Sequence, residues 1–177
     1  MINIDNLLCR RPVLGDVEAL LELKNNEKAS YLLAGQRRIY KQEDIVGWIE
    51  FHNNNPEELL LVIEDTDACK LIGHIGLYKI DHIARKAEIG ILIADDGSRG
   101  KGYGTKLTKL LIDYAFMQLR LHKVTAEVLK ENVPSLAMFK KCGFSVDGCM
   151  RDDVYKNDRY YDVISLSILS SEYYKND

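Results

Sequence analysis

The sequence has few of the residues that cross-link small or exported domains. Its four cysteines, Cys9, Cys69, Cys142 and Cys149, are scattered, with no Cys-x-x-Cys pair and no neighbouring histidine. A disulfide framework or a zinc site requires closely spaced ligands, so we expect neither, and no other bound metal. Unpaired thiols are typical of a cytoplasmic protein, which is the location that we expect.

Long apolar runs are also missing. No stretch approaches the roughly 18 residues that a membrane-spanning helix needs. The first segment, MINIDNLLCRRP, has neither the apolar centre nor the small-residue cleavage site of a signal peptide. The formal net charge of -3 provides no positive field for non-specific nucleic-acid binding. We therefore expect no membrane partner and no nucleic-acid partner.

Linkers and repeats are absent as well. The chain has only three prolines and no low-complexity tract, so no segment marks a domain boundary. A chain of 177 residues is typical of one domain and can bury about 70% of its unfolded surface. We expect a single domain over residues 1–177.

Short apolar runs alternate with amphipathic segments, which predicts a mixed α/β layer structure. Helices are predicted after Asp16, which we expect to cap the first helix, near Glu43 to His52, from about Thr105 to Leu119, and between Asn132 and Gly143. Strands are predicted at 6–13, 58–65, 70–81, 88–94, 123–129, 144–155 and 160–169. The run EIGILIA at 88–94 is apolar on both faces, which predicts a central strand.

A glycine-rich, basic turn, DDGSRGKGYGTKL, separates that central strand from the helix predicted at Thr105. Gly100, Gly102 and Gly104 permit a positive φ and let a ligand approach the backbone. A helix start adds unpaired N–H groups and the positive end of the helix dipole. We therefore predict that the amides from Lys101 to Thr105 bind phosphate, with further positive charge from Arg99 and Lys101.

Two common phosphate-binding loops fit this turn poorly. The dinucleotide fingerprint requires GxGxxG, whereas the spacing here is GxGxG, and the Walker pattern GxxxxGK[ST] is absent. A glycine-rich strand-to-helix turn that binds nothing is the alternative interpretation.

The spacing that matches is [R/Q]-x-x-G-x-[G/A], present as RGKGYG at 99–104. It resembles the acetyl-CoA pyrophosphate motif of the GNAT (Gcn5-related) N-acetyltransferases. RRPVLGDVEALLEL is similar to the opening strand and helix of that family, and ENVPSLAMFKKCGF is similar to its late helix. These matches occur in order over nearly the whole chain. The pattern most resembles the branch of ribosomal-protein N-terminal and spermidine acetyltransferases.

The resemblance implies an acyl-CoA N-acyltransferase fold, with a mostly antiparallel sheet of about seven strands and flanking helices. It also implies an acetyl-CoA-dependent N-acetyltransferase in which an amine attacks the thioester directly, and homodimerisation is expected at the level of the family. Acetyl-CoA would lie between the splayed fourth and fifth strands. The implied binding residues are Ile91, Leu92, Ile93, Arg99, Gly100, Lys101, Gly102, Tyr103, Gly104, Thr105 and Asn132.

A base is needed because an alkylammonium with a pKa near 10 must lose a proton before it attacks. Glu88, at the start of the central strand, is our candidate. The alternative is a structural carboxylate that orients a neighbouring group or pairs with Lys86 or Arg85. His74 and His82 are further candidates, although a histidine inside a strand is more often structural.

The family's general acid is missing. Many members have a tyrosine four residues before the glycine of Gly-Phe, and this chain has Phe139 there. The leaving thiolate could be protonated by Ser135, by Tyr155 or Tyr160, or by water, or it could leave unassisted, since a free thiol has a pKa of about 8.5. Ser135 is our candidate, against a role in capping its helix only. We interpret Cys142 as a structural thiol, not a nucleophile.

The sequence does not distinguish between four classes of acceptor: a small-molecule amine, a polyamine, an amino sugar or a protein N-terminus. The basic residues of the first connection, Lys28, Arg37, Arg38 and Lys41, slightly favour an anionic amine, whereas EDIVGWIE and CMRDDVYKNDRYYD offer acidic groups. A non-catalytic acetyl-CoA sensor or scaffold of the same fold is the alternative function, because Phe139 supplies no proton.

Overall fold

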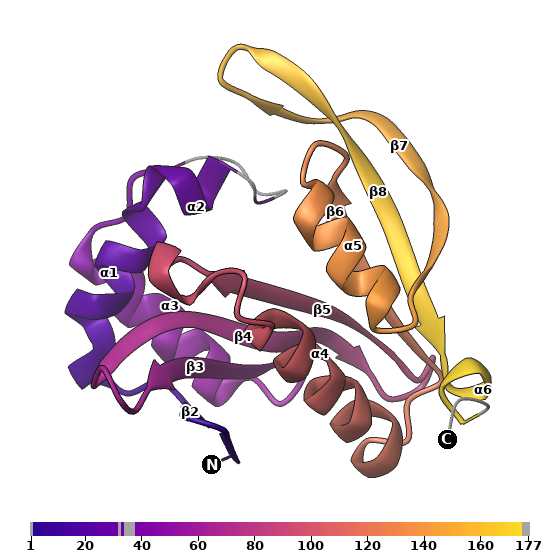
Figure 1. Ribbon diagram of the computed structural model, residues 1–177, viewed down its shortest axis with the longest axis horizontal. Coiled ribbons are helices and arrows are strands. Elements are labelled where there is room, and N and C mark those ends of the chain that lie inside the picture. Colours follow the sequence, from indigo (N-terminus) through magenta and orange to yellow (C-terminus); the bar gives the residue numbers. More distant parts are fainter. Residues whose placement is uncertain (1, 32, 34–37, 175–177) are drawn as a thin grey trace.

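One sheet of eight strands runs through the computed structural model, which describes residues 2–31, 33 and 38–174 (Figure 1). The strand order is β1-β2-β3-β4-β5-β6-β8-β7, and every neighbouring pair is antiparallel except β5 and β6. The strands are β1 (Ile2–Ile4), β2 (Leu7–Arg10), β3 (Leu59–Asp65), β4 (Lys70–Asp81), β5 (Lys86–Ile93), β6 (Lys123–Leu129), β7 (Ser145–Lys156) and β8 (Arg159–Leu169).

The mixed, mostly antiparallel α/β class is confirmed, and one detail of the strand count differs. The segment 6–13, predicted as a single strand, contributes only β2, because β2 ends at Arg10 before Pro12, which has no N–H to donate. A left-handed residue, Asp5, at φ 51°, turns the chain into an additional short strand, β1. The central position of the EIGILIA strand is confirmed by β5.

Helices cover both faces of the sheet (Figure 1). They are α1 (Val17–Asn25), α2 (Glu27–Tyr31), α3 (Gln42–Asn54), α4 (Tyr103–Asp113), α5 (Val133–Lys141) and α6 (Ser170–Tyr173). One buried cluster joins α1 and α3 to the sheet through Leu20, Ile45 and Leu92. A larger cluster joins α4 and α5 to the opposite face, where Ala87 and Ile89 of β5 are buried. Alternate residues of β5 therefore face different helix layers.

The parallel strands β5 and β6 stay together over a short distance only. Their register comprises Lys86↔Lys123, Ala87↔Val124 and Glu88↔Thr125. Beyond Glu88, β5 continues to pair with β4 up to Ile93, while β6 continues to pair with β8 up to Leu129. The sheet thus opens between β5 and β6, and Figure 1 shows β6, β8, β7 and α5 turned away from the strands before them.

The helices differ from the sequence-based expectation at both ends of α4 and in two additional short helices. The helix predicted at Thr105 begins at Tyr103, because Gly102 already takes the left-handed N-cap conformation at φ 81°, and α4 is followed by a π-helical turn at Tyr114–Gln118. Helices α2 and α6 were not predicted. They have five and four residues, too few for a periodic apolar pattern.

Asp16 lies at the start of α1 as predicted, but its carboxylate makes no cap bond to that helix. Instead it accepts a hydrogen bond from the Val13 amide at 2.8 Å and two from the Arg10 guanidinium, at 2.7 and 2.8 Å. The Asp16 side chain is 8% exposed. Although burial raises the pKa of a carboxyl group, the hydrogen bonds from Arg10 and Val13 outweigh it and lower the pKa of Asp16.

We predict that Asp16→Asn lowers the free energy of unfolding by about 3 kcal/mol at pH 7, because the guanidinium of Arg10 loses its buried partner. The depressed pKa means that the wild-type contribution is present above about pH 4 and is lost as pH falls through the folded value. Urea unfolding at pH 7 and pH 3 measures both effects. Lys123→Met, which removes a more exposed pair with Asp147, is the control and should cost less than about 1 kcal/mol. An Asp16→Asn loss no larger than this control contradicts the prediction.

Candidate active site

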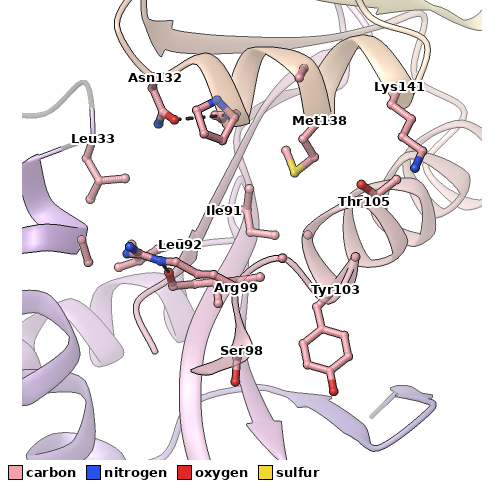
Figure 2. A pocket seen from close by; sticks show the side chains of 18 residues that line it. Leu33, Ile91, Leu92, Ser98, Arg99, Tyr103, Thr105, Asn132, Met138 and Lys141 are labelled. Carbon is pink, nitrogen blue, oxygen red and sulfur yellow. Dashed lines mark hydrogen bonds between the residues drawn. The ribbon is translucent and has the colours of Figure 1, made fainter. Parts of the chain in front are cut away.

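A cavity of about 670 Å³ lies where β5 and β6 separate. Its walls come from β5, from the glycine loop with the start of α4, and from α5 (Figure 2). Ala29 of α2 and Leu33, which follows α2, complete the lining. We call this space the cleft. Because β5 has no parallel partner beyond Glu88, one edge of its backbone faces the cleft with N–H and C=O groups that the ladder does not use. An extended ligand arm can pair there.

The glycine loop gives the cleft its anion-binding end. Gly100 and Gly102 have φ of 75° and 81°, conformations that other residues adopt only at a cost. A Cβ atom at either position would meet nothing within 4 Å, so the loop borders open space. The first helical hydrogen bond of α4 runs from the amide of Lys106 to the carbonyl oxygen of the N-cap residue, Gly102, at 3.1 Å. The amides of the first helical turn, which begins at Tyr103, are therefore available to phosphate oxygens.

Arg99 is fixed at the mouth of this loop. Its Nε donates to the carbonyl oxygen of Ile93 at 3.0 Å, and its Nη1 lies 3.1 Å from the carboxylate of Asp96. The guanidinium therefore bridges the end of β5 and the loop. In Figure 2 it lies beside Leu92 at the edge of the cleft.

The structure brings the predicted acetyl-CoA residues together, with one exception. Ile91, Leu92, Ile93, Arg99, Gly100, Gly102, Tyr103, Gly104, Thr105 and Asn132 all line the cleft. Lys101 is not among the lining residues, and its ammonium lies 5.8 Å from the ring centre of Tyr103. The unpaired edge of β5 and the free amides at one end suit a pantetheine arm joined to a pyrophosphate.

Two of these residues also have structural roles. The Tyr103 side chain points away from the cleft and donates from its hydroxyl to Oδ1 of Asn6 at 2.9 Å (Figure 2). The side chain of Asn132 caps α5, since its Oδ1 accepts from the Ser135 amide at 3.2 Å. Tyr103 thus contributes its backbone to the loop, and Asn132 fixes the start of a helix that borders the cleft.

Sequence reasoning missed part of the lining. Met138 and Lys141 of α5 border the cleft, as do Ala29 and Leu33. A Cβ atom on Gly104 would lie 2.9 Å from Sδ of Met138, so this glycine lets α4 and α5 approach closely. No local pattern reveals these contacts, because they join elements that are far apart in the chain.

Glu88 lies at the last position where β5 pairs with β6, just outside the residues that line the cleft. Its side chain is 29% exposed, and its carboxylate accepts from the ammonium of Lys79 at 2.8 Å. The cation beside Glu88 is therefore Lys79, and not Lys86 or Arg85 as the structural alternative expected; Arg85 instead donates to the carbonyl oxygen of Arg120. The choice between a base and a structural carboxylate stays a prediction.

A second carboxylate, Glu58, interacts electrostatically with Glu88. Burial raises the pKa of Glu58, and the negative charge of Glu88 raises it further. Burial, followed by the charges of the same two carboxylates, raises the pKa of Tyr78, which lies opposite Glu88 in the β4–β5 register. We call Glu58 and Glu88 the carboxylate pair.

The two histidines considered as bases lie in different settings. His74 is buried in β4 against Trp48, with ring centres 5.2 Å apart, and burial followed by the charges of Lys24 and His52 holds its pKa well below the usual value. It is therefore neutral near pH 7. His82 is exposed in the turn between β4 and β5.

Of the residues considered as general acids, Ser135 lines the cleft. Phe139 does not, and its ring is buried against Phe144 with centres 5.0 Å apart. Tyr155 and Tyr160 pack on each other, exposed, at the end of the β7–β8 hairpin.

Cys142 is buried, and burial raises the pKa of its thiol. Its Sγ lies 3.6 Å from the carbonyl oxygen of Thr105, which agrees with a structural role. Among the described residues, no three histidine, cysteine or acidic side chains gather to hold a metal, and no helix is long and apolar enough to span a bilayer.

Two of the four basic residues of the first connection have acidic partners. Lys28 lies 3.3 Å from the carboxylate of Asp96, which also pairs with Arg99, and Arg38 lies 2.5 Å from that of Asp44. Arg37 lies outside the described residues. Part of the positive charge of this connection is therefore compensated.

The chain is similar to known acetyltransferases over most of its length. A family model described as an acetyltransferase (GNAT) domain matches residues 6–145. A spermidine N(1)-acetyltransferase of Vibrio cholerae serotype O1 is 32% identical over 160 residues, which cover 90% of each chain. The crystal structure of a Vibrio cholerae spermidine N-acetyltransferase in complex with CoA and spermine superposes with a TM-score of 0.85 at 30% identity, covering 96% of this chain and 98% of that one. A dodecameric structure of spermidine N-acetyltransferase from the same organism has a TM-score of 0.81 at 31% identity, covering 97% and 98%.

We predict that Gly102→Val weakens acetyl-CoA binding at least about tenfold while the protein stays folded. A β-branched residue disfavours the left-handed conformation by about 1–2 kcal/mol, and its side chain would occupy the open space beside the loop amides. Titration calorimetry with acetyl-CoA measures the change. Gly148→Val on β7 is the matched control, since its Cβ also meets nothing within 4 Å and it lies outside the cleft. Unchanged affinity in Gly102→Val would contradict the phosphate-binding role of the loop.

Proposed function

Since the chain belongs to the GNAT acetyltransferase family and is an acetyl-CoA-dependent N-acetyltransferase that acts on amines, we propose that its acceptor is a polyamine of the spermidine type. The observation that carries this proposal is the similarity to spermidine acetyltransferases over nearly the full length, one of them solved with CoA and spermine. The carboxylate pair, Glu58 and Glu88, supports it less directly. Lys79 already pairs with Glu88 at 2.8 Å and His52 lies 3.4 Å from Glu58, so an amine of the acceptor would have to compete with these groups.

The basic residues of the first connection argue against a cationic acceptor less strongly than their number indicates, because Lys28 and Arg38 each have an acidic partner. Of the alternatives considered from the sequence, the non-catalytic sensor is not supported, because the relatives with full-length similarity are named as acetyltransferases.

The chemistry that the cleft supports is direct transfer. The loop amides and the α4 dipole would hold the pyrophosphate, and the free edge of β5 along Ile91 to Ile93 would hold the arm in an extended conformation. A backbone N–H on the same edge would stabilise the oxyanion that forms as the amine attacks. Because the thioester and the amine meet in fixed orientation, proximity supplies much of the rate enhancement.

Glu88 is the group that we assign to proton removal. Its carboxylate lies at the apex where β5 and β6 part, on the face that carries Glu58. The attacking ammonium must lose its proton, and a carboxylate at this position accepts it directly or through a water.

Ser135 is the group that we assign to the leaving thiolate. Its residue lines the cleft at the first turn of α5, whereas the ring of Phe139 is buried and has no proton to give. A thiol with a pKa of about 8.5 is a fair leaving group, so the contribution of this acid is modest.

We further propose that the protein acts in the cytoplasm as a homo-oligomer. The four cysteines are unpaired, and a related spermidine acetyltransferase is dodecameric. Light scattering coupled to size-exclusion chromatography tests the assembly, and a monomer at micromolar concentration would contradict it.

The acceptor is tested by thiol release from acetyl-CoA with a panel of amines. Spermidine and spermine should react with kcat/KM at least about tenfold above an amino-sugar nucleotide and a peptide N-terminus. A monoamine of similar length, such as hexylamine, separates the effect of the second charge from that of the alkyl chain. A preference for the nucleotide or the peptide would overturn the polyamine assignment.

We predict that Glu88→Gln lowers kcat at least about 100-fold while the affinity for acetyl-CoA changes less than about threefold, because general base catalysis typically contributes 10²–10⁴. Steady-state kinetics and calorimetry give the two quantities. Glu64→Gln is the matched control, since Glu64 is also partly exposed and paired with a cation, Arg10, but lies on β3. An unchanged kcat in Glu88→Gln removes Glu88 as the base.

We predict that Ser135→Ala lowers kcat by about tenfold near pH 7 and by less at pH 9, where the thiolate needs no proton. Asn132 keeps its capping role, because its side-chain Oδ1 accepts from the backbone amide of residue 135 and not from the hydroxyl. The pH profile of kcat is the measurement. A loss that is equal at both pH values would assign Ser135 to the structure of the cleft only.

A further inference from the structure

Lys156 is a buried cation in an unusual place, the end of a strand in the β7–β8 hairpin. Its residue is only 5% exposed. Asn157 and Asp158 connect β7 to β8 with φ of 51° and 57°, as a tight two-residue hairpin turn requires. Lys156 pairs with Arg159 across that turn, so its position relative to β8 is well defined.

The ammonium of Lys156 is satisfied by the chain that follows α2. It donates to the carbonyl oxygen of Tyr31, the last residue of α2, and to that of Leu33 at 2.8 Å. It also lies over the rings of Tyr31 and Tyr161, at 5.4 and 5.3 Å from their centres. Carbonyl groups at a helix end lack partners within the helix and attract a cation. A buried ammonium is costly unless it has such partners, so this contact strongly favours one arrangement.

The segment held by Lys156 is a wall of the cleft. Ala29 and Leu33 line it from the side of α2, and Figure 2 shows Leu33 and Met138 on opposite sides of Ile91. Helix α2 has only five residues and cannot be stable through its own hydrogen bonds. Two other polar contacts of α2 are more exposed: Lys28 to Asp96 at 3.3 Å, and Arg159 to the hydroxyl of Tyr31 at 3.0 Å.

We propose that Lys156 is a positioning residue for acetyl transfer: by holding the end of α2 against the β7–β8 hairpin, it sets the wall of the cleft beside the acyl arm of acetyl-CoA. The pyrophosphate end of the cleft, at the glycine loop, is built by β5 and α4, and the contact of α2 with it through the exposed pair of Lys28 and Asp96 does not involve Lys156. The role of Lys156 therefore concerns the arm and not the nucleotide.

The nucleotide half of the coenzyme, 3′,5′-ADP, lacks the pantetheine arm and therefore tests the pyrophosphate end of the cleft separately from the arm end. Lys156→Met should weaken acetyl-CoA binding about tenfold and leave the affinity for 3′,5′-ADP within twofold of the wild type, both measured by calorimetry. Hydrogen exchange of the amides at 27–31 should become faster, with exchange in α4 unchanged. Lys156→Arg, which keeps a cation that can donate to both carbonyl groups, should retain most of the acetyl-CoA affinity.

Lys130→Met is the control, because Lys130 forms an exposed ion pair with Asp162 of the same hairpin at 2.8 Å and should bind both ligands normally. If Lys156→Met does not fold, Lys156→Gln, which retains one polar donor, and Lys156→Arg give the same comparison. Equal losses for both ligands would assign Lys156 to stability only, and unchanged binding of both would remove it as a positioning residue. Since no acceptor is used, failure here is distinct from failure of the polyamine assignment.

Discussion

After Glu88 the backbone of β5 has no parallel partner, while β6 continues along β8 alone. Backbone N–H and C=O groups inside a protein need hydrogen-bond partners, and the edge of a strand in the middle of a sheet is an exceptional place to leave them free. The separation of β5 and β6 therefore creates both the cleft and the reason that an extended arm binds in it. The site residues described above are arranged around this opening.

The two ends of the cleft have different chemistry because different elements build them. At one end, positive φ at Gly100 and Gly102 turns the first amides of α4 toward the open space, and Arg99 is held by the carbonyl oxygen of Ile93. Just beyond the other end lies Glu88, whose negative charge acts on Glu58. An anion-binding end and an acidic end suit a reaction that joins a phosphate-bearing donor to a cationic acceptor.

Features with a local signal could be predicted from the sequence. The apolar run of β5, the glycine loop and the boundaries of α5 at Asn132 and Gly143 all depend on neighbouring residues, and each lies where it was expected. Features made by distant parts of the chain could not. The Lys79 partner of Glu88 comes from a different strand, and α2 is held in place by Lys156, which lies more than a hundred residues later. The short α2 has no apolar period of its own, so only the tertiary contact reveals its role.

The central claim is that the cleft between β5 and β6 binds acetyl-CoA in the native state. Thermal unfolding with increasing acetyl-CoA tests it most directly, because a ligand that binds only the native state stabilises it by mass action. At a concentration about 100 times the dissociation constant, the stabilisation is about 2.7 kcal/mol, which corresponds to a rise in Tm of about 5–10 °C for a chain of this size. That rise is the result we predict, and an unchanged Tm at millimolar acetyl-CoA would contradict the account.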